Sequence, residues 1–192
     1  SDVYKRQLSD YRVVIVGVTD PQVSDLIDRR ELVTVGNEIE IDARTLAAHI
    51  GLAKATKDYS LVRTISFHSR IKSASRFATD HLKILDWLPE SHTPNGTHWA
   101  GSISGAMNTG ERRRLLNQLR KNEPGRHALL TNARCLTEGV DVPSLDGVAF
   151  IDPRSSQVDI IQAVGRAIRK SHGKSLGIIV LPVLIPVVPN AS

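Results

Sequence analysis

The sequence predicts a three-layer α/β fold, in which a mainly parallel sheet is covered by helices on both faces. Short apolar runs rich in valine and isoleucine alternate along the chain with segments of helical periodicity. The first such run, Tyr11–Val18, is almost continuously apolar, which is typical of a strand buried on both faces. Strand and helix signals then repeat as β-then-α units, and such units fold into a parallel sheet between two helical layers.

Capping and turn signals divide the first half of the chain into elements. Asp20-Pro21 supplies an N-cap and a first-turn proline, and Asp42 supplies a second N-cap. Val33–Ile41 alternates loosely, as a short hairpin does, and Thr93–Gly96 reads as a turn. The elements expected in order are the strand Tyr11–Val18, a short helix to about Arg30, this hairpin, a helix from Asp42 through Leu52, the strand Arg63–His68, a helix from Ser69 to about Leu88 and the strand Trp99–Ser104.

The second half of the chain continues the same alternation. Asn108 and Glu111 form a capping-box pattern, which opens a helix that buries Leu115, Leu116 and Leu119. An irregular loop separates the two strands that come next. The expected elements are this helix, the strands Arg126–Thr131 and Gly147–Ile151, the helix Ser155–Lys170 and the strand Leu176–Leu181.

Length and pattern indicate one folded domain. The 192 residues can bury one good core, and the sequence contains neither an internal repeat nor a second domain. We expect the domain to occupy residues 8–185, with a linker or assembly scar at 1–7 and an irregular tail at 186–192. The apolar run Leu176–Val188 is about 13 residues long and contains two prolines, whereas a membrane span needs about 20, so no membrane contact is expected.

Composition narrows the choice of partner and compartment. The net charge of +5 favours an anionic partner such as nucleic acid or a nucleotide, and the aromatic content of 4% disfavours base stacking as the main binding mode. Cys135 is the single cysteine, which excludes an internal disulfide and a multi-cysteine zinc site and favours the cytoplasm. The seven histidines lack metal-binding spacing, so we expect no metal site.

The segment from Gln162 to Arg169 reads Q-x-x-G-R-x-x-R and is the most informative part of the sequence. On a helix, Gln162, Arg166 and Arg169 fall on one stripe, and apolar residues gather on the opposite side. Gly165 leaves room for close approach, and the two guanidinium groups offer forked donors that suit a polyphosphate. The alternative is an exposed polar face of an amphipathic helix, which the spacing of the arginines alone would favour.

A second polar segment, Thr131–Pro143, begins where a predicted strand ends. Ligands of open parallel sheets bind beyond the carboxyl ends of the strands, where His68–Arg70 and the residues after Asp152 also arrive. In this segment Thr131 can donate a hydrogen bond to a phosphate, and Asp141 can accept one from a ribose hydroxyl. Taken alone, the segment is better explained as a surface loop with a satisfied carboxylate.

The order and spacing of these segments resemble a known family. Residues 131–143 read T-N-A-R-C-L-T-E-G-V-D-V-P, a strand D-G-V-A-F-I-D-P follows, and Gln162–Lys170 reads Q-A-V-G-R-A-I-R-K. These segments resemble motifs V and VI of superfamily 2 helicases, and R-T-I-S-F-H-S at Arg63–Ser69 stands where motif IV would be. Within this superfamily, the sequence is most similar to bacterial DEAD/DEAH-type helicases of the restriction-enzyme-like and helicase-associated-domain kind. The resemblance covers roughly Leu8 to Leu181 and implies a C-terminal RecA-like lobe.

The resemblance implies a role for each residue that matches a motif. Arg166 and Arg169 would be arginine fingers that reach an ATP γ-phosphate, and Gln162 would contact the same phosphate or the attacking water. A second group would lie on the nucleotide side, near the ribose and phosphates: Gly139, Asp141 and Gly165. The residues implied to face the nucleic-acid backbone are Thr131, Asn132, Ser69 and Arg70.

Two motifs of a complete motor are missing from this sequence. It contains neither the phosphate loop G-x-x-x-x-G-K-[ST] nor an acidic D-E-x-x box for magnesium. We therefore expect ATP and Mg2+ to be held mainly by a P-loop lobe, of the same protein or a partner chain, and the isolated chain to be inactive. The favoured function is the C-terminal lobe of an ATP-dependent helicase or translocase, with DNA preferred over RNA because of the restriction-like resemblance. The alternative is a stand-alone nucleic-acid-binding or regulatory module without ATP turnover.

Overall fold

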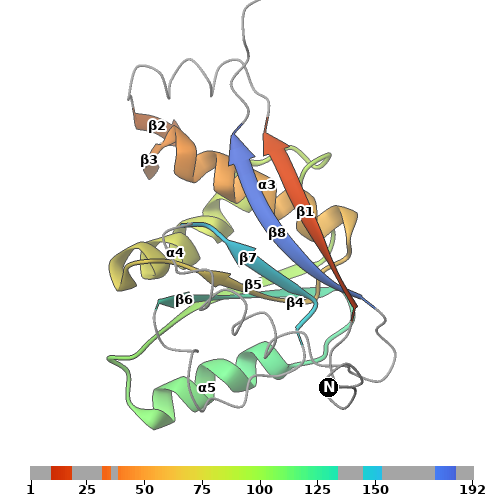
Figure 1. The fold of residues 1–192 in the computed structure, drawn as a ribbon. Coiled ribbons are helices and arrows are strands. Elements are labelled where there is room, and N and C mark those ends of the chain that lie inside the picture. The colour runs from red at the N-terminus through yellow and green to blue at the C-terminus, as the bar shows by residue number, and fades with distance from the viewer. Residues whose placement is uncertain (1–9, 19–31, 36–38, 134–144, 153–175, 185–192) are drawn as a thin grey trace, which may run out of the picture.

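The computed structural model of the chain describes residues 10–18, 32–35, 39–133, 145–152 and 176–184. In these ranges a six-stranded sheet crosses the molecule, and every neighbouring pair of its strands is parallel (Figure 1). Its strands, in spatial order, are β1 (Asp10–Val18), β8 (Leu176–Leu184), β7 (Gly147–Phe150), β4 (Arg63–Phe67), β6 (Arg126–Ala133) and β5 (Thr97–Ser104). The predicted parallel sheet is confirmed.

Helices cover both faces of this sheet. The helices α3 (Ala43–Asp58) and α4 (Ile71–Trp87) pack on one face, and α5 (Thr109–Arg120) packs on the other (Figure 1). Successive strand residues point to opposite faces, so Leu129 lies in one buried cluster with Phe77 of α4. Leu130 instead lies in a cluster with Leu116 and Leu119 of α5. The fold is therefore three-layered, as the sequence predicted.

The predicted hairpin is formed by β2 (Leu32–Val35) and β3 (Ile39–Asp42), which pair in antiparallel fashion. Ile41 of β3 is buried together with Leu46 of α3 and Ile84 of α4, which attaches the hairpin to this helical layer. β3 ends at Asp42, and the Asp42 carboxylate accepts a 3.0 Å hydrogen bond from the amide of Thr45. The predicted N-cap is therefore confirmed, and it makes the strand-to-helix transition abrupt.

Helix boundaries follow the predicted caps except at α4. The capping box of α5 is present, with the Asn108 side chain accepting from the amide of Glu111 at 2.9 Å and the Glu111 carboxylate accepting from the amide of Asn108 at 3.1 Å. The helix α4 has Arg70 as its N-cap and begins two residues later than predicted. The hydroxyl of Ser69 donates to the carboxylate of Asp152, and no side chain accepts a hydrogen bond from the first turn of the helix as a cap. The helices predicted to end near residue 30 and to span 155–170 lie outside the described residues.

The strand β8 is longer than predicted and passes through Pro182. Its pairing with β1 continues to Val18 opposite Leu184, whereas its pairing with β7 ends at Val180. The amide of Ile178 donates towards β7, so by alternation position 182 also faces that side, beyond the end of β7. The proline therefore removes no ladder hydrogen bond of the described sheet. Among the described residues, no helix has the length and apolar character that a bilayer span requires.

The turn that precedes β5 needs a glycine at position 96. Gly96 has a φ of +113°, and a Cβ added there would lie 1.9 Å from the carbonyl oxygen of Gly125. The same Gly125 carbonyl accepts a 3.0 Å hydrogen bond from the amide of Thr97, so it cannot move away without loss of that bond. A side chain at this position is excluded both by the backbone conformation and by the space.

We expect Gly96→Ala to lower the free energy of unfolding by about 1–3 kcal/mol, because both the φ angle and the Gly125 carbonyl must adjust. Gly105→Ala is the matched control, since a Cβ added there meets nothing within 4 Å and its φ is not positive. The control should stay within about 0.5 kcal/mol of the parent protein in urea denaturation. Equal stability of the two variants would contradict this account of the turn.

Candidate functional site

The carboxyl ends of three strands lie side by side at one edge of the sheet. Phe67 of β4 is level with Asn132 of β6 on one side and with Phe150 of β7 on the other. Beyond the strands, the amide of His68 donates to the carbonyl of Asn132 at 2.9 Å, and the amide of Ile151 donates to the carbonyl of Phe67 at 3.3 Å. The edge expected to bind ligands in an open parallel sheet is therefore well defined here.

A pocket of about 480 Å³ opens at this edge, between the first turns of α3 and α4. Residues after β4 and β7 contribute to it, together with β3 and the two helices. Its lining residues are Glu40, Ile41, Asp42, Arg44, Thr45, Ala48, His68, Ser73, Arg76, Phe77, Asp80, Ile151 and Asp152. The volume is that of a small-molecule site, and the lining combines buried apolar groups with charges of both signs.

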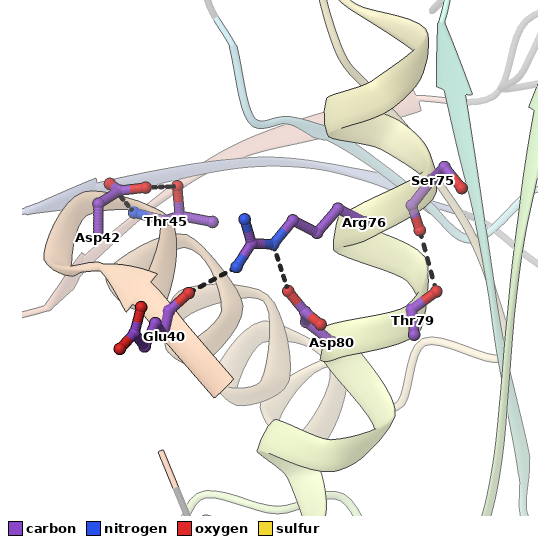
Figure 2. A network of polar contacts seen from close by, with 7 residues as sticks. All are labelled: Glu40, Asp42, Thr45, Ser75, Arg76, Thr79 and Asp80. Carbon is purple, nitrogen blue, oxygen red and sulfur yellow. Dashed lines mark hydrogen bonds and ion pairs between the residues drawn. The ribbon is translucent and has the colours of Figure 1, made fainter. Parts of the chain in front are cut away.

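Arg76 connects two walls of this pocket. Figure 2 shows its guanidinium between Glu40 and Asp80, where it donates to the Glu40 carbonyl at 2.5 Å and to the Asp80 carboxylate at 3.2 Å. Both oxygens of the Asp42 carboxylate accept hydrogen bonds from Thr45, one from its amide and the second, at 2.6 Å, from its hydroxyl. These pairings hold β3, α3 and α4 together, so the charged groups of this wall serve first to shape the pocket.

His68 lies beside the pocket as a neutral side chain. It is 5% exposed, its Nε2 lies 3.0 Å from the hydroxyl of Ser66, and its ring centroid is 4.9 Å from that of Phe77. Burial lowers the pKa of His68 to about 4, and the charge of Asp152 offsets this lowering only in part. At neutral pH this histidine is therefore a local hydrogen-bonding group and not a cation for a phosphate.

Ser69 and Arg70, two of the predicted site residues, are brought to this edge. Ser69 is half-buried and donates its hydroxyl hydrogen to Asp152, whereas Arg70 is exposed as the N-cap of α4. Of the three helices in the described ranges, α4 alone has no side-chain cap, and its first turn contains no acidic residue. The first turn of α4 thus presents backbone N–H groups beside an arginine, an arrangement that suits an anion.

Thr131 and Asn132, the other two predicted nucleic-acid contacts, lie deeper. Thr131 is 0% exposed and Asn132 is 1% exposed. The Thr131 hydroxyl donates to the carbonyl of Ala74 at 2.8 Å, so it fastens the first turns of α4 to the sheet. In this structure the threonine side chain therefore points into the core, beneath α4, and its contact with a nucleic-acid backbone stays a prediction.

The remaining predicted site residues lie outside the described ranges. They are Gln162, Arg166, Arg169, Gly139, Asp141 and Gly165. Their roles stay predictions. Within the described ranges, no group of three or more histidine, cysteine or acidic side chains is arranged to hold a metal ion.

Sequence reasoning missed Asp152 as a member of the site. The residue follows the predicted strand Gly147–Ile151, at the edge where ligands were expected, so a signal was present. Its partner Ser69 could be found only from the register of β4 against β7, which places Phe67 level with Phe150. Arg76 and Asp80 were missed for a different reason, because an i,i+4 ion pair on a helix looks like an ordinary solvated pair.

Comparison with known sequences assigns most of the chain to one family. The model of the family described as helicase conserved C-terminal domain matches residues 50–171. A stretch of 54 residues is 44% identical to the protein named "Probable helicase A859L" of African swine fever virus. That stretch covers 28% of this chain and 6% of the viral protein, so the chain spans only a small part of this relative.

Solved structures with the same fold include a restriction enzyme and two DEAD-box proteins. The ATP-dependent Type ISP restriction-modification enzyme LlaBIII bound to DNA is 28% identical with a TM-score of 0.73, over 96% of this chain and 12% of that chain. Domain 2 of the Mss116p DEAD-box helicase, bound to an RNA duplex, is 16% identical with a TM-score of 0.55. The match covers 90% of this chain and 54% of that chain. The E. coli DEAD-box protein SrmB is 19% identical with a TM-score of 0.53, over 73% of this chain and 72% of that chain. The two DEAD-box proteins are similar in fold alone.

A stack of rings under α4 makes the stability of the fold depend on pH. The Nδ1 atoms of His49 and His81 lie 3.0 Å apart, and the His49 ring is stacked on Phe77 with 3.7 Å between centroids. Burial lowers the pKa of His81 to about 3. Burial also lowers the pKa of His49 well below its usual value, with smaller contributions from His81 and His68. All three histidines are therefore neutral in the folded protein at mildly acidic pH.

We expect the free energy of unfolding to fall as the pH is lowered from about 6.5 to 5. Below about pH 6.5 the unfolded chain binds protons at these histidines while the folded chain does not. Each histidine therefore lowers the free energy of unfolding by up to about 1.4 kcal/mol for each pH unit below that point. Urea denaturation at several pH values measures the slope of the free energy of unfolding against pH. His68→Gln should reduce this slope by the contribution of one histidine. The comparison variant His92→Gln, outside this stack, measures the effect of replacing a histidine as such. An unchanged slope in His68→Gln would refute the assignment.

Proposed function

The chain belongs to the helicase conserved C-terminal domain family, and from this premise we propose that it is the C-terminal lobe of an ATP-dependent helicase or translocase. The lobe would contact nucleic acid at the carboxyl edge of the sheet and would complete an ATPase site held mainly by a P-loop lobe. Water would attack the γ-phosphate there and give ADP and phosphate. Opening and closing of the cleft between the lobes would move the nucleic acid.

The observation that carries the nucleic-acid side of this proposal is the uncapped first turn of α4. The N-termini of α3 and α5 are closed by Asp42 and by the Asn108–Glu111 capping box. The first turn of α4 has neither device, and it adjoins Ser69 and the exposed Arg70. N–H groups that no side chain caps, the positive end of a helix and a guanidinium together favour a backbone phosphate at this position.

The nucleotide side of the proposal rests on the motif residues that follow β6 and β7 in the chain. Arg166 and Arg169 would stabilise charge on the transferred phosphoryl group, and Gln162 would contact the same phosphate or the attacking water. Gly139, Asp141 and Gly165 would contact the ribose and phosphates. ATP and Mg2+ would be held mainly by the P-loop lobe, because this sequence contains neither the phosphate loop nor the acidic box.

We propose DNA as the nucleic acid. The neighbour LlaBIII is 28% identical and is bound to DNA, whereas the neighbour bound to an RNA duplex is similar in fold alone. The alternative function is a stand-alone nucleic-acid-binding or regulatory module without ATP turnover. One observation favours it, namely that these 192 residues contain neither a phosphate loop nor a D-E-x-x box.

We expect Arg166→Ala to lower ATP hydrolysis by the assembled two-lobe enzyme at least about 1,000-fold, because arginine fingers contribute rate factors of this size. DNA binding should change less than about threefold, since the finger acts on the nucleotide. Steady-state hydrolysis with saturating DNA measures the first effect, and fluorescence anisotropy measures the second. Arg113→Ala, which removes an exposed arginine of α5, is the control and should keep normal hydrolysis. Equal loss of binding with and without ATP would count against the motor.

We expect Arg70→Ala to weaken binding of a single-stranded DNA oligonucleotide about three- to tenfold, because one phosphate contact is lost. The slope of log affinity against log salt concentration should fall by about 1. Anisotropy titrations at several salt concentrations give both quantities, and Arg113→Ala again serves as the charge-matched control. If the two variants lose the same affinity and slope, the effect is one of net charge and the α4 site is not supported.

A further inference from the structure

We propose that Asp152 is a positioning residue, whose carboxylate holds the Ser69 hydroxyl and thereby fixes the turn from β4 into α4. The inference rests on the proposed function, because this turn is where a nucleic-acid phosphate is placed. It assigns to Ser69 an indirect role, in which the side chain orients the turn and the phosphate is bound by neighbouring groups.

The register of the sheet brings these two residues together. Phe67 is level with Phe150, and the amide of Ile151 still bonds to the carbonyl of Phe67 one residue beyond the ladder. Continuing the same register by two residues places Ser69 opposite Asp152. Beyond the point where the backbones of β4 and β7 pair, the next residues in register are therefore joined through their side chains, by the hydrogen bond from the Ser69 hydroxyl to the Asp152 carboxylate.

Hydrogen-bond chemistry limits what Ser69 can do in this arrangement. A serine hydroxyl has one hydrogen to donate, and here that hydrogen goes to a carboxylate. Phosphate oxygens only accept hydrogen bonds, so the Ser69 hydroxyl cannot serve a phosphate while it serves Asp152. Binding of a phosphate at this turn then falls to the backbone N–H groups of the first turn of α4 and to Arg70.

Two side chains from the strands on either side of β4 hold the start of α4. Thr131 of β6 donates to the carbonyl of Ala74 from beneath the helix, and Asp152 after β7 accepts from Ser69 at the edge. The Asp152 carboxylate also supplies a negative charge one residue before the N-cap of a helix that has no acidic residue in its first turn. Asp152 directly precedes the segment that contains Gln162 and Arg166, so the bond connects the nucleic-acid turn to the chain leading to the proposed fingers.

The test compares Asp152→Ala, Asp152→Asn, Ser69→Ala and the double alanine variant in binding of a labelled single-stranded DNA oligonucleotide. Asp152→Ala and Ser69→Ala should each weaken binding about three- to tenfold, the value of one net hydrogen bond. The double variant should be no weaker than either single one, because both remove the same bond. Asp152→Asn should stay within about twofold of the parent, since an amide oxygen also accepts from the hydroxyl.

A charge control separates positioning from simple electrostatics. Asp86→Ala removes an exposed carboxylate at the far end of α4 and reports the effect of net charge alone. If Asp152→Ala binds as tightly as Asp86→Ala, the inference is wrong. If in addition Ser69→Ala weakens binding while Asp152→Ala does not, Ser69 contacts the phosphate directly.

Hydrogen exchange without nucleic acid provides an independent readout. The amide of Ala74, which bonds to the carbonyl of Arg70 at 3.0 Å, reports formation of the first turn of α4. Its exchange should be about three- to tenfold faster in Asp152→Ala and Ser69→Ala, and unchanged in Asp152→Asn. If the parent chain binds no DNA, the proposed function fails while this measurement still decides the role of Asp152. Unchanged exchange in Asp152→Ala would overturn the inference.

Discussion

The parallel alignment of β4 with β6 and β7 is the constraint on which the candidate site depends. It places Phe67 level with Asn132 and Phe150, so three segments that are distant in the sequence end at one edge. The alternation of the strands fixes this register, because Leu129 and Leu130 must enter different cores on opposite faces. A slip by one residue would exchange the two faces and remove Thr131 from α4. The packing of the core therefore determines the geometry of the edge.

The helix α4 transmits this constraint from the core to the edge. Its underside is buried against the sheet through Ala74 and Phe77, and its first turn lies at the edge with Arg70 exposed. The polar groups beneath the helix are neutral, because burial lowers the pKa of both His68 and His81. A permanent charge at either position would carry a desolvation cost, which at His68 the charge of Asp152 would offset only in part. Charge at this end of the molecule is consequently concentrated in the groups that reach solvent.

Local signals in the sequence predicted the elements, and long-range contacts account for what they missed. The caps at Asp42 and Asn108 were found because the capping residue and the helix it caps are adjacent in sequence. The predicted start of α4 is too early because Ser69, a typical capping residue, lies one residue before the actual N-cap, and its hydroxyl donates to Asp152 beyond the end of β7. Pro182 was read as the end of a strand because its tolerance depends on where β7 stops. In each case the missing information was the spatial order of the strands, which local patterns do not contain.

The N-termini of the three described helices differ in how their backbone amides are satisfied. A carboxylate cap at α3 and a capping box at α5 satisfy the amides of those helices and oppose the approach of phosphates. At α4 the corresponding carboxylate, Asp152, lies beyond the end of β7 and contacts the turn through Ser69. Its effect on the turn can therefore change when the end of β7 moves, whereas a cap within the helix moves with the helix. In the proposed function, this hydrogen bond would make phosphate binding at α4 depend on the position of Asp152.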